Sequence, residues 1–196
     1  IDKIEPNNKE DYAKGFVSHT LTIGELANQI KNGFAYGSHY HNAYRNSDNF
    51  QAADIVSVDI DEGMTIDEAL SHPLVQRAAT LVYTTASHQP DAHRFRIVFA
   101  LPRTITDPIE FRSVMRSLAL RLNGDGSTVD PARMFYGNRN AEIFSLGRGI
   151  DDQLLAELIE QSVTNTRSKT GQTQTVISQL RIPPDLQIQA ANGFIG

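Results

Sequence analysis

The chain has 196 residues and a mass of 21.7 kDa, enough for one domain with a hydrophobic core or for two small ones. It contains no cysteine, which excludes disulfide frameworks, zinc ribbons, iron–sulfur centres and thiol catalysis, so any metal must be held by carboxylate or imidazole groups. A net charge of −5 at pH 7 argues against a protein that coats nucleic acid by electrostatic attraction alone. No apolar run has the roughly 20 residues of a membrane helix, and a reducing cytoplasm is the expected location.

The first half of the chain predicts a helix, an irregular segment and a strand. Thr22-Ile-Gly-Glu25 is a capping box, apolar residues follow it at helical spacing, and Gly33 is a stop signal, so we expect a helix over 22–32. Residues 34–51 show no clear period and indicate a loop or short irregular strands. The alternation over 53–61 predicts a strand whose apolar side chains share one face. Ser57, Asp59 and Asp61 would then share the other face.

The remaining pattern predicts a mixed α/β domain. The expected elements are a helix from Thr65 with a break near His72-Pro73, a hairpin of strands 81–85 and 95–101, a helix over 107–122, short strands 133–136 and 143–146, and a helix over 151–161. Residues 162–174 have the polar composition of a linker. We therefore expect one domain over 1–161, and a polar linker with a C-terminal extension over 162–196 that either packs on the core or leads to a further domain.

Three acidic residues are the candidate metal ligands. Asp59 and Asp61 lie two apart at the end of an otherwise apolar strand, so their carboxylates project from the same face about 7 Å apart. Two negative carboxylates this close repel each other, unless divalent cations lie between them. Ligands made only of oxygen select Mg²⁺ or Mn²⁺. Asp130 precedes the predicted strand 133–136 and completes a triad if the strands are adjacent, although by itself it is more typical of a turn.

Cationic side chains supply the complementary chemistry. His88 follows a strand among hydroxyl residues, where its imidazole can donate to a phosphate. Arg94 and Arg96 share one face of their strand and either line a phosphate site or face solvent. All nine basic residues of segment 88–148 are arginine, the side chain best suited to gripping phosphate. Carboxylates for metals and cations for phosphates together favour two-metal phosphoryl transfer.

The order of these motifs resembles that of the archaeo-eukaryotic primase superfamily, and in particular its plasmid- and phage-borne primase-polymerases. The matching segments are Val58-Asp-Ile-Asp61, Thr84-Thr-Ala-Ser-His88 with Arg94-Phe-Arg96, and Val129-Asp-Pro-Ala-Arg133 with its aromatic followers. The likeness covers about residues 20–160. It implies an RRM-like catalytic sheet with flanking helices and a small N-terminal α/β unit.

The resemblance also implies residue roles and partners. Asp59, Asp61 and Asp130 would be catalytic and hold two Mg²⁺ or Mn²⁺ ions, and His88, Arg94 and Arg96 would bind the nucleotide. The expected function is DNA primase and polymerase activity in the replication of a plasmid, phage or similar element. The expected partners are a single-stranded DNA template, a primer, ribo- or deoxynucleoside triphosphates, and a helicase domain or protein after the linker.

Two other interpretations stay open at this point. His39 and His41 match the His-hydrophobe-His pattern of rolling-circle replication nickases, with Tyr44 or Tyr136 as nucleophile. Alternatively, the sheet is a non-catalytic platform for single-stranded nucleic acid. The aromatic residues that would stack bases are Phe95, Phe99, Phe135 and Tyr136.

Overall fold

The computed structural model describes residues 13–126 and 129–170 of the chain. Its elements, in chain order, are α1 (Ile23–Lys31), β1 (His39–Tyr40), η2 (His41–Ala43), η3 (Ser47–Asn49), β2 (Phe50–Ile60), α2 (Ile66–Ser71), α3 (Pro73–Ala78), β3 (Leu81–Thr84), β4 (Phe95–Ile105), α4 (Pro108–Arg121), β5 (Ile143–Ser145) and α5 (Asp152–Thr170). The chain divides after Thr164 into two units, and the site described below lies in the first of them. Within the described ranges, no helix combines the length and apolarity needed to cross a membrane.

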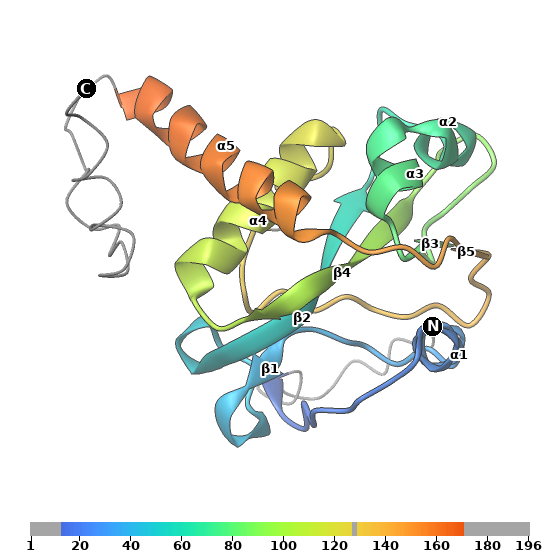
Figure 1. Cartoon of the computed structure of the whole chain (residues 1–196). Coiled ribbons are helices and arrows are strands. Elements are labelled where there is room, and N and C mark those ends of the chain that lie inside the picture. Colours follow the sequence, from blue (N-terminus) through green and yellow to red (C-terminus); the bar gives the residue numbers. More distant parts are fainter. Residues whose placement is uncertain (1–12, 127–128, 171–196) are drawn as a thin grey trace, which may run out of the picture. The chain divides into compact units, whose positions relative to one another are not determined.

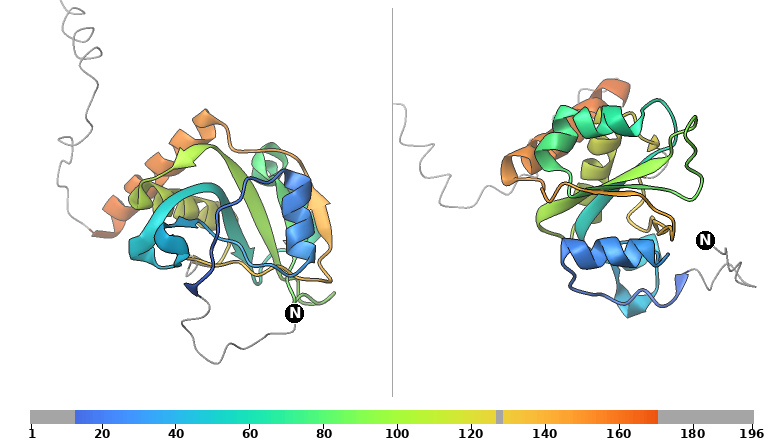
Figure 2. Two further views of the ribbon diagram at one scale, coloured as in Figure 1. Left: turned by 90° about the horizontal axis from the view of Figure 1, so that it is seen from below. Right: turned by 90° about the vertical axis from the view of Figure 1, so that its right-hand side faces the viewer.

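The strands form one sheet in the order β1-β2-β4-β3-β5, and every neighbouring pair is antiparallel. The long strands β2 and β4 lie at its centre, where Val58 pairs with Ile97 and Asp59 pairs with Arg96. Helices α2, α3 and α4 cover one face of the sheet, whereas α1 lies on the other (Figures 1 and 2). The expected mixed α/β class, a sheet with flanking helices, is confirmed.

Alternation along β2 divides its side chains between two cores. Val56, Val58 and Ile60 pack in the larger core, together with buried residues of α2 to α5. Ile55 packs in a smaller core on the opposite face, against α1, Leu81, Tyr83 and Val98. By the same alternation, Ser57 and Asp59 project from the α1 face, as the sequence pattern predicts. Both residues are only 4% exposed, so this polar row of β2 is buried.

Local sequence signals account for the helix boundaries. Thr22 with Glu25 and Thr65 with Glu68 form capping boxes at the starts of α1 and α2. His72 ends α2 and caps α3, so the predicted break at His72-Pro73 is confirmed. The hairpin of β3 and β4 and the helix α4, capped by Asp107, are also confirmed.

Two predicted segments differ from the structure. Residues 133–136 form no named strand, because only Phe135 pairs, through two backbone hydrogen bonds of 2.9 Å with Tyr36. The last helix runs on to Thr170, so residues 162–170 of the predicted linker are helical. Polar composition does not exclude a helix that continues from an apolar, well-packed first half containing Leu154, Leu155 and Leu158. The remainder of the predicted linker and extension, 171–196, lies outside the described residues.

Candidate active site

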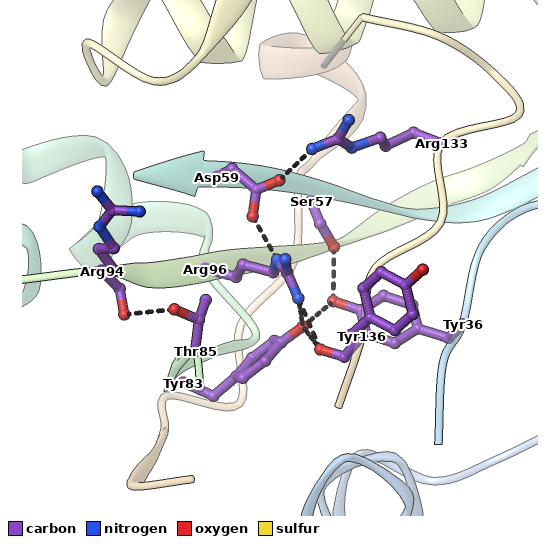
Figure 3. Close-up of polar contacts among 9 residues, drawn as sticks. All are labelled: Tyr36, Ser57, Asp59, Tyr83, Thr85, Arg94, Arg96, Arg133 and Tyr136. Carbon is purple, nitrogen blue, oxygen red and sulfur yellow. Dashed lines mark hydrogen bonds and ion pairs between the residues drawn. The ribbon is translucent and has the colours of Figure 1, made fainter. Parts of the chain in front are cut away.

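A buried ion pair lies on the α1 face of the sheet, between its two central strands (Figure 3). Arg96 Nε donates to Asp59 Oδ1, and the side chains are 11% and 6% exposed. The Arg96 Nη1 also donates to the Tyr83 hydroxyl at 3.1 Å and to the Tyr136 carbonyl at 2.6 Å. Its guanidinium carbon lies 5.8 Å from the centroid of the Tyr83 ring and 5.5 Å from that of Phe135. These contacts fix Arg96 in one position.

Two tyrosine hydroxyls extend this polar network. The Tyr36 hydroxyl lies 3.0 Å from Ser57 Oγ and 3.2 Å from the Tyr83 hydroxyl. Burial raises the pKa of both tyrosines above the ordinary value, so both rings stay neutral and available as donors. Burial opposes the charge of Arg96, but the neighbouring Tyr83 and Asp59 raise its pKa above the ordinary value. Arg96 therefore remains a cation in this network.

Arg133 is a second cation on the same carboxylate. Its Nη2 donates to Asp59 Oδ2 at 3.2 Å, across 74 residues of sequence. The Arg133 side chain is 39% exposed, and its Nε is buried with no hydrogen-bond partner in the described part of the chain. The residue roles inferred from the sequence omitted Arg133, although the Asp130-Pro-Ala-Arg133 motif was the signal that could have identified it.

The other two predicted metal ligands are exposed. Asp61 lies just beyond the end of β2. Asp130 Oδ1 accepts hydrogen bonds from Ser47 Oγ at 2.8 Å and from the Ala132 backbone N–H at 3.0 Å. The Asp130 carbonyl accepts from the backbone N–H of Arg133 at 2.7 Å. Asp130 thus begins a tight turn, and Arg133 joins this turn to Asp59.

The three carboxylates suit Mg²⁺ or Mn²⁺ in chemical kind but are not arranged as a formed metal site. In residues 13–126 and 129–170, no group of three or more His, Cys, Asp or Glu side chains is placed to hold one ion. Asp59 is not free to bind a metal ion, because one of its carboxylate oxygens accepts a hydrogen bond from Arg96 and the other accepts one from Arg133. Metal binding by Asp59, Asp61 and Asp130 stays a prediction.

The loop between β3 and β4 carries the predicted phosphate ligand His88. Its Nδ1 accepts from the Arg94 backbone N–H at 3.1 Å, so the neutral ring carries its proton on Nε2. The His88 ring lies edge-on to that of His93, with centroids 5.3 Å apart. The Arg94 side chain is exposed, and its carbonyl accepts from Thr85 Oγ1 at 3.2 Å (Figure 3). His88 Nε2–H and the Arg94 guanidinium are the groups here that suit an anion.

The position of the Arg96 side chain agrees with neither of the two alternatives that the sequence offered for Arg94 and Arg96. The two side chains were expected to line a phosphate site or face solvent, and Arg94 is indeed exposed. Arg96 instead donates to Asp59 and Tyr83 within the protein. The reason is its register position opposite Asp59 on the neighbouring strand.

The histidines of the nickase interpretation lie at the edge of the sheet. His39 Nε2 lies 2.7 Å from Asp54 Oδ2 and His39 Nδ1 lies 2.7 Å from Ser18 Oγ, beside a depression of about 240 Å³. His41 is exposed in the short helix η2 after β1. His39 is thus bound to a carboxylate and a hydroxyl, an arrangement that gives no support to a shared metal with His41.

Most of the aromatic residues of the platform interpretation are core residues. Phe95 and Phe99 are fully buried in the larger core. Phe135 is 5% exposed and stacks on Tyr36 with ring centroids 5.6 Å apart. Tyr136 alone of the four is exposed, at 41%. The burial of Phe95, Phe99 and Phe135 therefore contradicts the alternative interpretation in which these rings stack bases.

Comparison with known proteins identifies the family. The VapE N-terminal domain model matches residues 16–153, which include the whole sheet and the Asp59 site. The chain belongs to the VapE N-terminal domain family. No curated protein matches.

A solved structure with a similar fold is the AEP domain of the Cyanophage S-2L primase-polymerase (PrimPol). It is 11% identical, has a TM-score of 0.48, and is matched over 78% of this chain and 84% of that one. A likeness at this level of identity says nothing of activity, for which the residues of this chain must provide the argument.

Proposed function

We propose that this domain is a template-directed nucleotidyltransferase of the primase-polymerase kind, which extends or initiates strands on single-stranded DNA. The observation that carries the proposal is the convergence of three motifs on Asp59. The end of β2 supplies Asp59, the Arg-x-Arg strand supplies Arg96, and the Asp-Pro-x-Arg segment supplies Arg133. Segments 37 and 74 residues away in sequence thus meet at one buried carboxylate.

The proposed roles follow from the chemistry of each side chain and from its contacts within the protein. Asp59, Asp61 and Asp130 would hold Mg²⁺ or Mn²⁺, which when bound would activate the attacking hydroxyl and neutralise the triphosphate. His88 and Arg94 would bind the triphosphate, because both lie beside the end of β4 and one is exposed and cationic. We assign Arg96 to positioning Asp59 rather than to binding nucleotide, because Tyr83 and the Tyr136 carbonyl hold its guanidinium inside the protein.

The proposed partners follow from the family and the charge of the chain. Template and primer strands would be held weakly and in a salt-dependent manner, since the chain carries a net charge of −5. The proposed setting is the replication of a phage or plasmid element, and a helicase domain or protein is a further proposed partner.

The experiment is nucleotide incorporation on a single-stranded template, with and without a primer, in Mn²⁺ or Mg²⁺. Asp61→Asn and Asp130→Asn are the test variants, because both residues are exposed and an asparagine at 130 keeps a side-chain oxygen that can accept from Ser47 and Ala132. Each should lower the rate on the order of a hundredfold or more. Glu62→Gln is the matched control, since it removes the neighbouring exposed carboxylate and should leave the rate unchanged. Absence of incorporation by the wild-type domain, or equal rates in all four proteins, would refute the proposal.

A further inference from the structure

The two arginines on Asp59 are held very differently. Arg96 donates to Asp59, Tyr83 and the Tyr136 carbonyl and lies against two aromatic rings, with 11% of its side chain exposed. Arg133 makes one hydrogen bond of 3.2 Å to Asp59 and is 39% exposed. That distance is long for a charge-assisted bond, which is about 2.7–2.9 Å when strong. Arg133 can therefore leave Asp59 with far less loss of contact than Arg96.

An unpartnered atom also marks Arg133 as incompletely bound. Its Nε is buried and has no hydrogen-bond partner among the described residues. Buried polar groups are nearly always paired, because leaving one unpaired costs its hydration. The Arg133 guanidinium therefore makes fewer and weaker hydrogen bonds here than it could make to another anion. A conformation that pairs more of its donors would be favoured when a suitable anion is present.

The position of Arg133 connects the proposed metal ligands. Its backbone N–H donates to the Asp130 carbonyl at 2.7 Å, while its side chain reaches Asp59. Asp130, Arg133 and Ser57 line the same narrow crevice. The guanidinium thus covers the Asp59 oxygen that Arg96 leaves open. A cation in contact with that oxygen would meet direct repulsion from Arg133.

We infer that Arg133 is an exchangeable cover on Asp59, which leaves the carboxylate for the phosphates of an incoming nucleoside triphosphate and thereby opens Asp59 to a divalent cation. This inference rests on the proposed function. A triphosphate offers several anionic oxygens, and a guanidinium binds phosphate through two parallel hydrogen bonds where Asp59 gives it one. Nucleotide entry and cation binding are then coupled through one side chain.

The test measures Mn²⁺ binding in the absence of nucleotide, using the electron paramagnetic resonance signal of free Mn²⁺ as the readout. Arg133→Gln should bind Mn²⁺ at least about fivefold more tightly than the wild type, because the competing charge is gone. Arg133→Lys keeps a cation and should stay closer to the wild type. Arg103→Gln is the matched control, since Arg103 is an exposed arginine paired with the single carboxylate of Glu110 near the other end of β4.

Two further measurements separate this inference from simpler explanations. The gain in Mn²⁺ affinity should disappear in an Asp59→Asn/Arg133→Gln protein that keeps a native circular dichroism spectrum. The nucleotide KM of Arg133→Gln should rise at least about fivefold. Unchanged or weaker Mn²⁺ binding in Arg133→Gln, with a native circular dichroism spectrum, would overturn the inference. If Asp61→Asn still abolishes incorporation in that case, the proposed function stands and only the role of Arg133 fails. If the wild type incorporates no nucleotide, both fail together.

Discussion

Asp59 and Arg96 lie directly opposite each other near the end of β2 and the start of β4, and their buried side chains form an ion pair between these two central strands. The proposed catalytic carboxylate is thus also part of the packing between the two central strands. Removal of Asp59 would leave a buried guanidinium without its counter-charge, so an inactive Asp59→Ala variant would confound lost chemistry with lost folding. Asp61 is exposed and carries no such ambiguity, and Asp130→Asn keeps a side-chain oxygen for the hydrogen bonds from Ser47 and Ala132.

The first prediction concerns the unequal contributions of the two arginines to stability. Arg96→Ala should lower the free energy of unfolding by about 3–5 kcal/mol, the range for breaking a buried ion pair from one side. Arg133→Ala should lower it by less than about 1 kcal/mol, because its pair is partly exposed and Asp59 keeps Arg96. Urea denaturation of both variants measures the difference. Equal losses would contradict the assignment of Arg96 as the fixed partner.

The second prediction concerns alkaline stability. Burial raises the pKa of Tyr36 and Tyr83 above the ordinary value of 10.0, so the folded protein keeps protons that the unfolded chain releases. Their contribution is complete below pH 10 and is lost as the pH rises above it. Each tyrosine should lower the free energy of unfolding by about 1.4 kcal/mol per pH unit in that range.

Denaturation between pH 9 and 11.5 measures this slope. Tyr36→Phe and Tyr83→Phe should each make the dependence of stability on pH shallower. Both variants also lose a hydrogen bond of the hydroxyl, which lowers stability at every pH. Tyr136→Phe is the control for the removal of a tyrosine hydroxyl, because that ring is 41% exposed. A slope that is the same in all four proteins would show that the buried hydroxyls do not govern the alkaline limb.

The third prediction separates the polymerase from the nickase interpretation. His39→Ala with His41→Ala should leave nucleotide incorporation within about twofold of the wild type, since both residues lie at the β1 edge rather than near Asp59. The same double variant should lose cleavage of single-stranded DNA only if the histidines form a nickase site. Incorporation and cleavage are measured on the same labelled oligonucleotide, so one gel decides between the two functions.

The sequence was sufficient where local patterns control structure. Thr22 and Thr65 begin helices through capping boxes, and the alternation over 53–61 assigns Ser57 and Asp59 to one face. Asp59 could be identified as a candidate functional residue because two acidic residues at the end of an apolar strand are unusual unless they bind a ligand. Its place in the buried network could not, because it depends on the register of β2 against β4 and on the path of residues 133–136.

Arg96 and Phe135 illustrate what the sequence could not provide. An arginine that alternates with apolar residues predicts an exposed side chain or a ligand site, unless a partner lies on the next strand. That partner is 37 residues away, and no local pattern encodes the pairing. Phe135 likewise resembles a strand residue, but its single pairing with Tyr36 brings it over the guanidinium of Arg96.

The last prediction concerns the close approach of Gly124 to the end of β2. A Cβ at this position would lie 2.4 Å from Val58 Cγ1 and 3.0 Å from the Asp59 carbonyl. The next residue, Asp125, donates its backbone N–H to that same carbonyl at 3.0 Å. Gly124→Ala must therefore push residues 124 and 125 away from the end of β2.

We expect Gly124→Ala to lower the free energy of unfolding by about 1–3 kcal/mol, the usual cost of overpacking. It should also slow nucleotide incorporation at least about tenfold, because small displacements of catalytic groups have large effects on rate. Gly126→Ala is the matched control, since nothing lies within 4 Å of a Cβ there, and it should change neither quantity appreciably. Full activity in a destabilised Gly124→Ala protein would contradict this prediction, because the contact of Gly124 with the backbone of Asp59 would then not matter for the chemistry.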